Sequence, residues 1–202
     1  MARAPRSRQK SRPPNTPAGD AAGTRTKEVD PAYKSARSIT VFAAAAVLGA
    51  AADLVSKHFV FAALLGREGH RVTAIPGVLR LTLSTNPGIV FGIRLPGPLV
   101  PIATLAMVAV VILLFATSWR RLWGLHLGLG MILGGALGNA YDRLLVSVKF
   151  PDEPLARTRQ VRDFIDVYAI GYPVFNVADI LLVVGVGLIV LYMFRHGRQR
   201  AA

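Results

Sequence analysis

Four long runs of apolar residues, separated by shorter polar segments, dominate the hydropathy pattern of the chain. They extend over residues 39–65, 98–119, 122–145 and 172–194. A helix that crosses the hydrocarbon core of a bilayer needs roughly 20 predominantly apolar residues, so each run is long enough. The pattern predicts an all-α membrane protein with four transmembrane helices in a single domain, residues 39–195. A soluble helical protein with buried helices is the alternative.

The polar segments between these runs have patterns of their own. VLRLTLS (78–84) alternates apolar and polar residues, which is typical of a β-strand. The Asn-Pro-Gly of the following STNPGIVFGI predicts a turn into a second short apolar run. We therefore predict a small extracytoplasmic β-sheet between the first two helices. The later segment KFPDEPLARTRQ (149–160) is predicted to be a solvated loop.

Composition agrees with a membrane protein, because 52% of the residues are hydrophobic and only 17% are charged. The net charge of +13 is concentrated in the tail, residues 1–38, whose composition cannot bury a core and predicts disorder. This tail has no aromatic residue before Tyr33, so we expect no nucleic-acid partner. Cysteine is absent, which excludes disulfides, thiolate metal sites and a cysteine nucleophile.

The distribution of Lys and Arg predicts the orientation in the membrane. The basic tail, the turn with Arg120 and Arg121, and the basic C-terminus (196–202) all lie on the same side of a four-helix arrangement. Short basic segments stay in the cytoplasm. Both termini are therefore predicted to be cytoplasmic.

Polar residues interrupt three of the four runs. At about 1.5 Å rise per helical residue, these positions all come to lie near the outer leaflet. They are Asp53, Lys57, Asn139, Asp142, Arg143, Asn176 and Asp179. Asn86 and Asp163 can approach the same level from the outer segments. Because ionisable side chains are costly inside a bilayer, several at one depth favour a shared polar site.

The chemistry open to this site is limited. The four histidines are scattered and form no zinc-binding pattern, so no metal is expected. Ser56 and Lys57 are adjacent on a helix and point apart, so they are unsuited to a dyad. If Asp163 and Asp179 come close, repulsion and apolar surroundings should raise the pKa of one of them. One carboxyl could then activate water while the other hydrogen-bonds a peptide carbonyl.

Two alternatives to a peptidase remain at this point. A small transporter or proton-relay protein could use the same carboxylates, but the cytoplasmic halves of the runs lack a continuous polar path. A structural network could instead join the helices through ion pairs, such as Asp53 with Lys57 and Asp142 with Arg143.

Several short motifs give the chain a specific resemblance. GGALGNAYDR (134–143), VRDFID (161–166) and FNVAD (175–179) occur in that order, after Asp53 and Lys57 in the first run and NPGIVFGI (86–93). In these motifs the chain resembles the lipoprotein signal peptidases, also called signal peptidase II. The resemblance implies a four-helix aspartyl endopeptidase of the bacterial inner (cytoplasmic) membrane, with its active site near the outer leaflet.

The same resemblance implies the substrate and the partners. The substrates would be prolipoproteins whose lipobox Cys carries diacylglycerol, cut just before that Cys. Membrane lipids would surround the enzyme, and the cyclic peptide globomycin would occupy the substrate groove. No metal or cofactor is implied.

Roles for individual residues also follow from the resemblance. The catalytic pair falls on Asp163 and Asp179, while Asp53 and Lys57 would pair and brace the site. Substrate binding or support of the pair is expected of Asn86, Gly88, Phe91, Asn139, Arg143 and Asn176. Apolar lining of the groove is expected of Phe91, Ile93 and Phe175. From sequence alone, Asp142 and Asp166 compete with Asp163.

Two features depart from the pattern of the family. Val90 stands where the family more often has Ala. The loop between Arg143 and Asp163 is longer than usual, which could alter substrate access.

Overall fold

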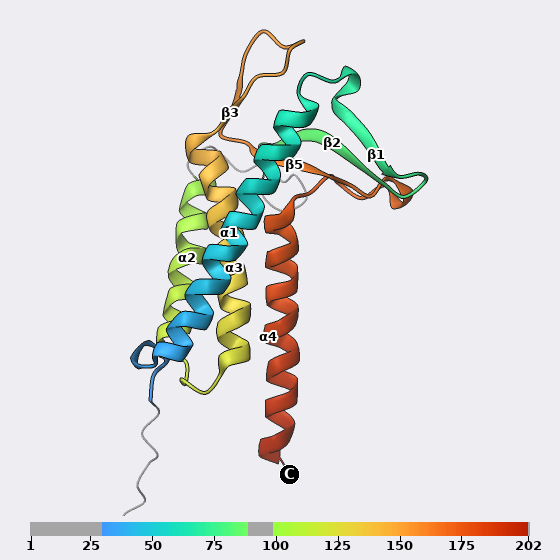
Figure 1. Cartoon of the computed structure of the whole chain (residues 1–202). Helices are drawn as coiled ribbons and strands as arrows, with labels where there is room; N and C mark the ends of the chain where they lie inside the picture. Colours follow the sequence, from blue (N-terminus) through green and yellow to red (C-terminus); the bar gives the residue numbers. More distant parts are fainter. Residues whose placement is uncertain (1–29, 89–98, 202) are drawn as a thin grey trace, which may run out of the picture.

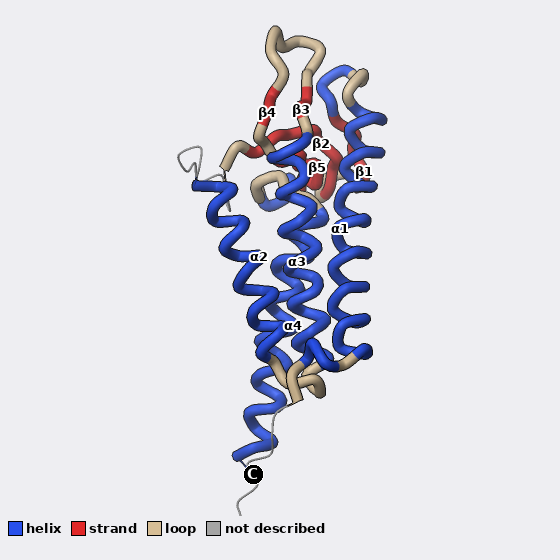
Figure 2. Tube along the Cα trace, turned by 90° about the vertical axis from the view of Figure 1, so that its left-hand side faces the viewer, coloured by secondary structure: helices blue, strands red, loops and turns tan. Residues whose placement is uncertain are grey.

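The computed structural model describes residues 30–88 and 99–201. The helices are α1 (Ala36–Leu64), α2 (Leu99–Thr117), α3 (Trp123–Leu145) and α4 (Val177–Ala201), which run alongside one another as a bundle (Figure 1). Helix α3 contacts each of the other three. Figure 2 shows α3 between α1 and α2, with the strands gathered at one end of the bundle.

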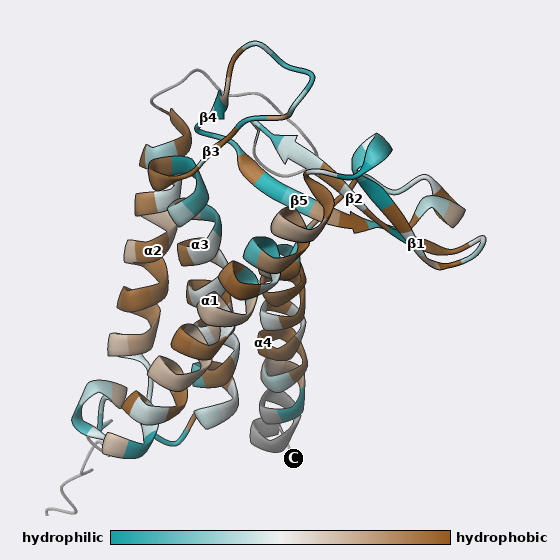
Figure 3. Cartoon of the chain, turned by 45° about the horizontal axis from the view of Figure 1, so that its top comes forward, coloured by the Kyte–Doolittle hydropathy of each residue, from teal (hydrophilic) through white to brown (hydrophobic). Residues whose placement is uncertain are grey.

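The described residues include three helices that are long and apolar enough to cross a membrane: α1, α2 and Val177–Arg195 of α4. Helix α3 is less apolar, because it carries glycines and polar residues where it packs against its neighbours. The bundle has the four helices that were predicted, but the prediction that all four are transmembrane helices is not confirmed, because α3 is not among the candidate membrane spans. In Figure 3, hydrophobic residues predominate along the helices, and hydrophilic residues are frequent among the strands and loops.

Two helix ends differ from the prediction. The tail was predicted to reach residue 38, but a 3₁₀ helix forms at Ala32–Lys34 and α1 begins at Ala36. The Ala32 N–H donates to the carbonyl of Ser118, at 2.8 Å, so this segment is fixed against the turn after α2. Residues 1–29 of the tail lie outside the described residues.

The fourth helix begins later than predicted, at Val177 instead of residue 172. Before it, the backbone of Phe175 pairs with Ile165 through N–H···O bonds of 2.8 and 3.0 Å. The chain is therefore extended here, because its backbone groups bond to a strand. The helix continues to Ala201, through most of the predicted C-terminal segment.

A three-stranded antiparallel sheet covers one end of the bundle. Its strands are β1 (Arg71–Ile75), β2 (Leu79–Asn86) and β5 (Val161–Asp166), in the order β1-β2-β5. The predicted strand at 78–84 is confirmed. The sheet is not confined to the segment between the first two helices, because β5 comes from the connection between α3 and α4.

The hairpin partner of β2 is the preceding β1. The second apolar run, 89–93, lies outside the described residues. The predicted solvated loop folds in part, since β3 (Ser147–Val148) pairs with β4 (Arg157–Thr158). Within it, Phe150 is buried in a cluster with Phe61 and Phe164. Burial of this aromatic ring explains why the segment is not a free loop.

Close packing of α3 against α1 depends on glycine. A Cβ atom built on Gly134 would lie 2.7 Å from the carbonyl oxygen of Ala46, and one on Gly138 would lie 2.3 Å from Asp53 Oδ2. On another side of α3, a Cβ on Gly135 would lie 2.6 Å from the carbonyl of Ala178 in α4. Glycine therefore lets α3 approach both neighbours, as expected for small residues at helix interfaces in membranes.

We expect Gly134→Ala to destabilise the protein, because the added methyl group would overlap with backbone atoms of α1, which cannot move away as a side chain can. Overpacking of this kind costs about 1–3 kcal/mol. Thermal unfolding in detergent, followed by circular dichroism, should show a lower midpoint. Gly187→Ala in α4 is the control, since a Cβ there has nothing within 4 Å. A midpoint for Gly134→Ala as high as that of Gly187→Ala would contradict the packing argument.

Candidate active site

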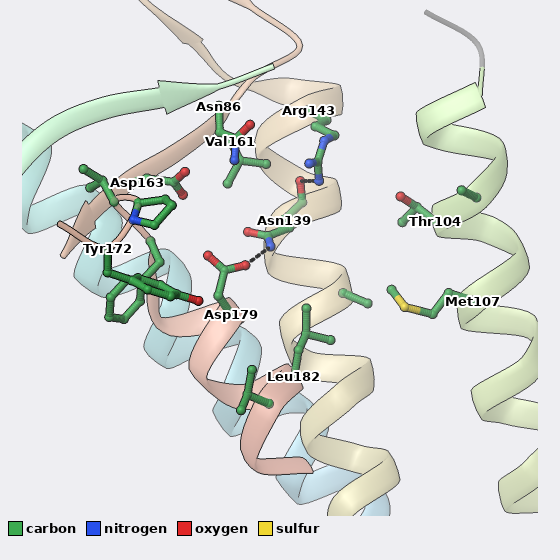
Figure 4. Close-up of a pocket in the computed structure, with 16 residues that line it drawn as sticks. Asn86, Thr104, Met107, Asn139, Arg143, Val161, Asp163, Tyr172, Asp179 and Leu182 are labelled. Carbon is green, nitrogen blue, oxygen red and sulfur yellow. Dashed lines mark hydrogen bonds between the residues drawn. The ribbon is translucent and has the colours of Figure 1, made fainter. Parts of the chain in front are cut away.

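A cavity of about 370 Å³ lies where the sheet meets the helices. Its walls come from α2, α3, α4, the ends of β2 and β5, and the segment before α4 (Figure 4). The polar side chains that line it include Asn86, Asn139, Arg143, Asp163 and Asp179. Apolar side chains such as Met107 and Leu182 continue the cavity toward the middle of the helices. The cavity therefore has a polar end and an apolar end.

Asp163 reaches the cavity from β5, where it is opposite Ser84 of β2. Asp163 is almost fully buried, with only 3% of the residue exposed. Burial, followed by the nearby charge of Asp179, raises the pKa of Asp163 to about 7, while hydrogen bonds from Asn176 and Asn86 oppose the shift. This carboxyl can therefore hold a proton near neutral pH.

Asp179 reaches the cavity from the first turn of α4, and it also caps that helix. Its Oδ2 accepts from the backbone N–H of Asn176 at 3.1 Å, and Asn176 Oδ1 accepts from the backbone N–H of Asp179 at 3.1 Å. This reciprocal pair is a capping box, with Asp in the place usually taken by Glu or Gln. The orientation of Asp179 is therefore fixed by the start of its own helix.

Two amide side chains connect the carboxylates. Asn176 Nδ2 donates to Asp163 Oδ1 at 2.6 Å, and Asn139 Nδ2 donates to Asp179 Oδ1 at 3.2 Å. Asn139 Oδ1 accepts from Lys57 Nζ at 2.9 Å. Because an ammonium group can only donate, it fixes which end of the Asn139 amide faces Asp179.

The predicted pair of Asp53 and Lys57 is present. Lys57 Nζ lies 2.6 Å from Asp53 Oδ2, and both side chains are fully buried. The alternative pair of Asp142 with Arg143 is not the one that forms. Asp142 instead contacts Lys57 at 3.2 Å and Arg162 at 2.7 Å. Adjacent residues of a helix point in different directions, so Asp142 faces the interior while Arg143 faces the cavity.

The residues near the turn after β2 contact one another. Asn86 lines the cavity, and its Oδ1 accepts from the backbone N–H of Gly88 at 2.9 Å. The carbonyl of Gly88 accepts from Arg143 Nη2 at 2.7 Å. Phe91 and Ile93 lie outside the described residues, whereas Phe175 lines the cavity.

Three further positions are decided by their contacts. Asn176 is fully buried and is not among the residues that line the cavity, so its geometry fits support of the carboxylates better than contact with a substrate. Asp166 pairs with Arg80 within the sheet and does not line the cavity, and Asp142 is fully buried. Of the three competing aspartates, only Asp163 reaches the cavity.

Sequence reasoning missed Arg162 and the residues that α2 contributes. Arg162 bonds Asp142 through its guanidinium and through its backbone N–H, at 2.7 to 3.0 Å. Its position beside Asp163 in the VRDFID motif was a usable signal, since a cation that becomes buried there needs a partner. Thr104 and Met107 lie in a uniformly apolar run that gives no local indication of a cavity.

The described residues contain no group of three or more His, Cys, Asp and Glu side chains placed to hold a metal ion. Asp163 and Asp179 accept hydrogen bonds from asparagine amides, whereas the buried carboxylates behind the cavity pair with Lys57 and Arg162. The arrangement provides two carboxyl groups, hydrogen-bond donors and the apolar end of the cavity. These are the groups needed for acid–base chemistry on a neutral, partly apolar substrate.

Comparison with known proteins identifies the family. The family model described as "Signal peptidase (SPase) II" matches residues 45–195. The lipoprotein signal peptidase of Shouchella clausii (strain KSM-K16) is 38% identical over 133 residues, which cover 65% of this chain and 79% of that protein. The lipoprotein signal peptidase of Gloeobacter violaceus is 32% identical over 160 residues, covering 78% of this chain and 84% of that protein.

A solved structure described as a bacterial membrane enzyme, determined by the in meso method at 2.3 Å, has the same fold. It superposes with a TM-score of 0.63 at 30% sequence identity, and covers 78% of this chain and 89% of that one. The region that the family model matches, residues 45–195, contains α2, α3, the strands that carry the site and most of α1 and α4. The chain therefore belongs to the signal peptidase II family, a family of membrane-embedded peptidases that process lipoproteins.

Proposed function

We propose that this peptidase is an aspartyl endopeptidase that acts on diacylglyceryl-modified prolipoproteins and cuts just before the lipidated Cys. One observation carries the proposal: Asp163 and Asp179 line the polar end of a cavity whose other end is apolar. A transporter or proton-relay function is not favoured, because the chain belongs to a peptidase family.

The two carboxyl groups would divide the acid–base work. Asp163, whose pKa is raised to about 7, would keep the proton and donate a hydrogen bond to the scissile carbonyl. Asp179 would take a proton from water, and the resulting hydroxide would add to the carbonyl carbon. When the tetrahedral intermediate collapses, the C–N bond breaks and the leaving amine receives a proton from the carboxyl pair. No metal or cofactor takes part.

Residues beside the pair would position the substrate. Arg143 and Asn139 line the cavity next to the carboxylates and could hold the backbone of the bound peptide. Asn86 would contribute from the strand end, with Gly88 shaping the turn that Arg143 contacts. Globomycin, a cyclic peptide, would compete for the same groove.

The apolar end of the cavity fits a signal peptide. It lies between α2 and α4, with Met107 on one side, Leu182 on the other and the small Ala136 on α3. An apolar helix could pack there while the diacylglyceryl chains stay among membrane lipids. Many outward-facing residues of α2 are apolar and exposed, such as Leu105 at 71%, as expected for a lipid-facing surface.

We place the protein in the bacterial inner (cytoplasmic) membrane, with both termini cytoplasmic and the site near the outer leaflet. The basic turn of Arg120 and Arg121 supports this orientation, because it lies at the end of the bundle opposite the sheet (Figure 1). Helix α3 would be the fourth spanning helix. Its polar residues would be tolerated because they face the other helices and the cavity.

The proposal is tested by cleavage of a purified diacylglyceryl-modified prolipoprotein in lipid vesicles. We expect the wild-type protein to cut before the lipidated Cys, and Asp163→Asn and Asp179→Asn to lose at least about 10²–10⁴-fold in rate. Asp152→Asn is the matched control, since the Asp152 side chain is 92% exposed and outside the cavity. Normal cleavage by either Asn variant, or none by the wild type, would refute the aspartyl mechanism.

We expect the cleavage rate of the folded enzyme to fall as the pH rises through about 7. The reason is that Asp163 must hold a proton, and its pKa is raised to about 7. Initial rates between pH 5 and pH 9 give the pH at which the rate falls, which is the falling limb of the pH profile. The folded fraction is checked at each pH. A rate that stays constant between pH 6 and pH 9 would show that Asp163 does not act in its neutral form.

The raised pKa of Asp163 also predicts how stability depends on pH. The folded protein keeps this proton up to about 7, whereas the unfolded chain loses it near 3.8. The contribution of Asp163 is therefore fully present below pH 3.8 and is lost as the pH rises through 7. Because Asn stays neutral, Asp163→Asn should gain stability over the wild type between pH 4 and pH 8. Unfolding midpoints in detergent test this, and a difference that does not change with pH would contradict it.

A further inference from the structure

Four buried charged side chains lie behind the cavity, between the two elements that carry the proposed catalytic carboxylates. They are Asp53, Lys57, Asp142 and Arg162, with two positive and two negative charges. Three of them are fully buried, and the side chain of Arg162 is 11% exposed. None of the four lines the cavity. The four charges sum to zero, but charge neutralisation does not explain where the four side chains are placed.

Each of the two carboxylates in this group accepts a hydrogen bond from the backbone N–H of a residue next to a proposed catalytic residue. Asp142 Oδ2 accepts from the N–H of Arg162 at 3.0 Å, and the next residue is Asp163. Asp53 Oδ1 accepts from the N–H of Ala178 at 2.9 Å, and the next residue is Asp179. The main chain is therefore fixed one residue before each member of the pair.

Lys57 connects these two anchor points. Its ammonium lies 2.6 Å from Asp53 Oδ2, 3.2 Å from Asp142 Oδ2 and 2.9 Å from Asn139 Oδ1. The contacts with Asp53 and Asn139 are hydrogen bonds that the ammonium donates, and the contact with Asp142 is an ion pair. On the far side of Asp142, the Arg162 guanidinium donates twice to Oδ1, at 2.7 and 3.0 Å. A planar guanidinium fixes direction as well as distance.

Stability alone is a poor explanation for this arrangement. Well-packed apolar residues can often replace a buried ion pair without loss of stability, so such a network is weak evidence of stabilisation. Apolar side chains could not, however, accept the N–H groups of Arg162 and Ala178. The network provides a fixed connection between β5 and the start of α4.

We propose that Arg162 and Asp142 are positioning residues of the reaction. With Lys57 and Asp53 they form a strut that sets the separation of Asp163 and Asp179. This inference rests on the proposed function, because it assigns a role relative to that carboxyl pair. A shift of about 1 Å in reacting groups can cost about 100-fold in rate, so a strut of this kind has measurable consequences.

Substitution of Arg162 separates the strut from direct electrostatic effects. The charged groups that act on Asp163 are Asp179 from α4 and Lys57 from α1, and Arg143 from α3 interacts with both carboxylates. Arg162 instead faces Asp142 and the ring of Phe61, with 5.7 Å between its guanidinium carbon and the ring centroid. Arg162→Lys keeps the positive charge and removes the two-pronged contact.

The test compares Arg162→Lys and Arg162→Gln with the wild type in the vesicle cleavage assay, normalised to folded protein. We expect kcat to fall about 10- to 100-fold, more for Gln than for Lys, with KM unchanged within about threefold. We also expect the falling limb of the pH profile of Arg162→Lys to move to lower pH. A looser pair is farther apart and better hydrated, and both changes favour the charged form of Asp163.

Arg80→Lys is the matched control. Arg80 pairs with Asp166 between β2 and β5, so it joins the same strands without contacting the strut. It should retain the wild-type kcat and pH limb. The strut is refuted if Arg162→Lys has the wild-type kcat and limb, if only KM changes, or if Arg80→Lys shows the same losses. If the wild type does not cleave, or Asp163→Asn cleaves normally, the proposed function fails instead.

Discussion

The rest of the site depends on the interactions of the Lys57 ammonium group. It lies in a fully buried position where an unpaired charge would be very costly, so the surrounding chain must supply acceptors. Asp53 comes from its own helix, and Asp142 and Asn139 come from α3. Removal of one partner from a buried pair typically costs about 3–5 kcal/mol, because the other charge remains uncompensated. The requirement to satisfy this cation fixes α1 against α3 at the level of the cavity.

This contact is possible only because the helix backbones come close together. Gly138 faces the Asp53 carboxylate directly, and any larger side chain would occupy the space of that oxygen. Glycines on other sides of α3 admit α4 in the same way. Among the described residues, helix α3 is the one long helix that is not apolar enough to be a candidate membrane span, and it contacts each of the other three. Its polar residues face protein, which removes the cost that lipid would impose.

The two carboxylates owe their different surroundings to two kinds of local structure. Asp163 is on a buried strand, where loss of water raises its pKa. Asp179 is in the first turn of a helix, where a backbone N–H and an amide donate to it and the helix dipole favours negative charge. A strand and a helix end meeting at one cavity thus give chemically similar groups unequal environments. That inequality is what shared acid–base work requires.

Much of this was available from the sequence. Long apolar runs specify helices locally. The polar residues within them predicted a shared site, because ionisable side chains are costly in lipid and pair with one another. The motif resemblance indicated Asp163 over Asp142 and Asp166. Local pattern could not show that β5 joins β2, or that Arg162 meets Asp142, because both contacts join residues far apart in the chain. Tertiary structure alone decided which carboxylate faces the cavity and which one holds the backbone, since burial and hydrogen-bond partners exist only once the helices and the sheet are packed.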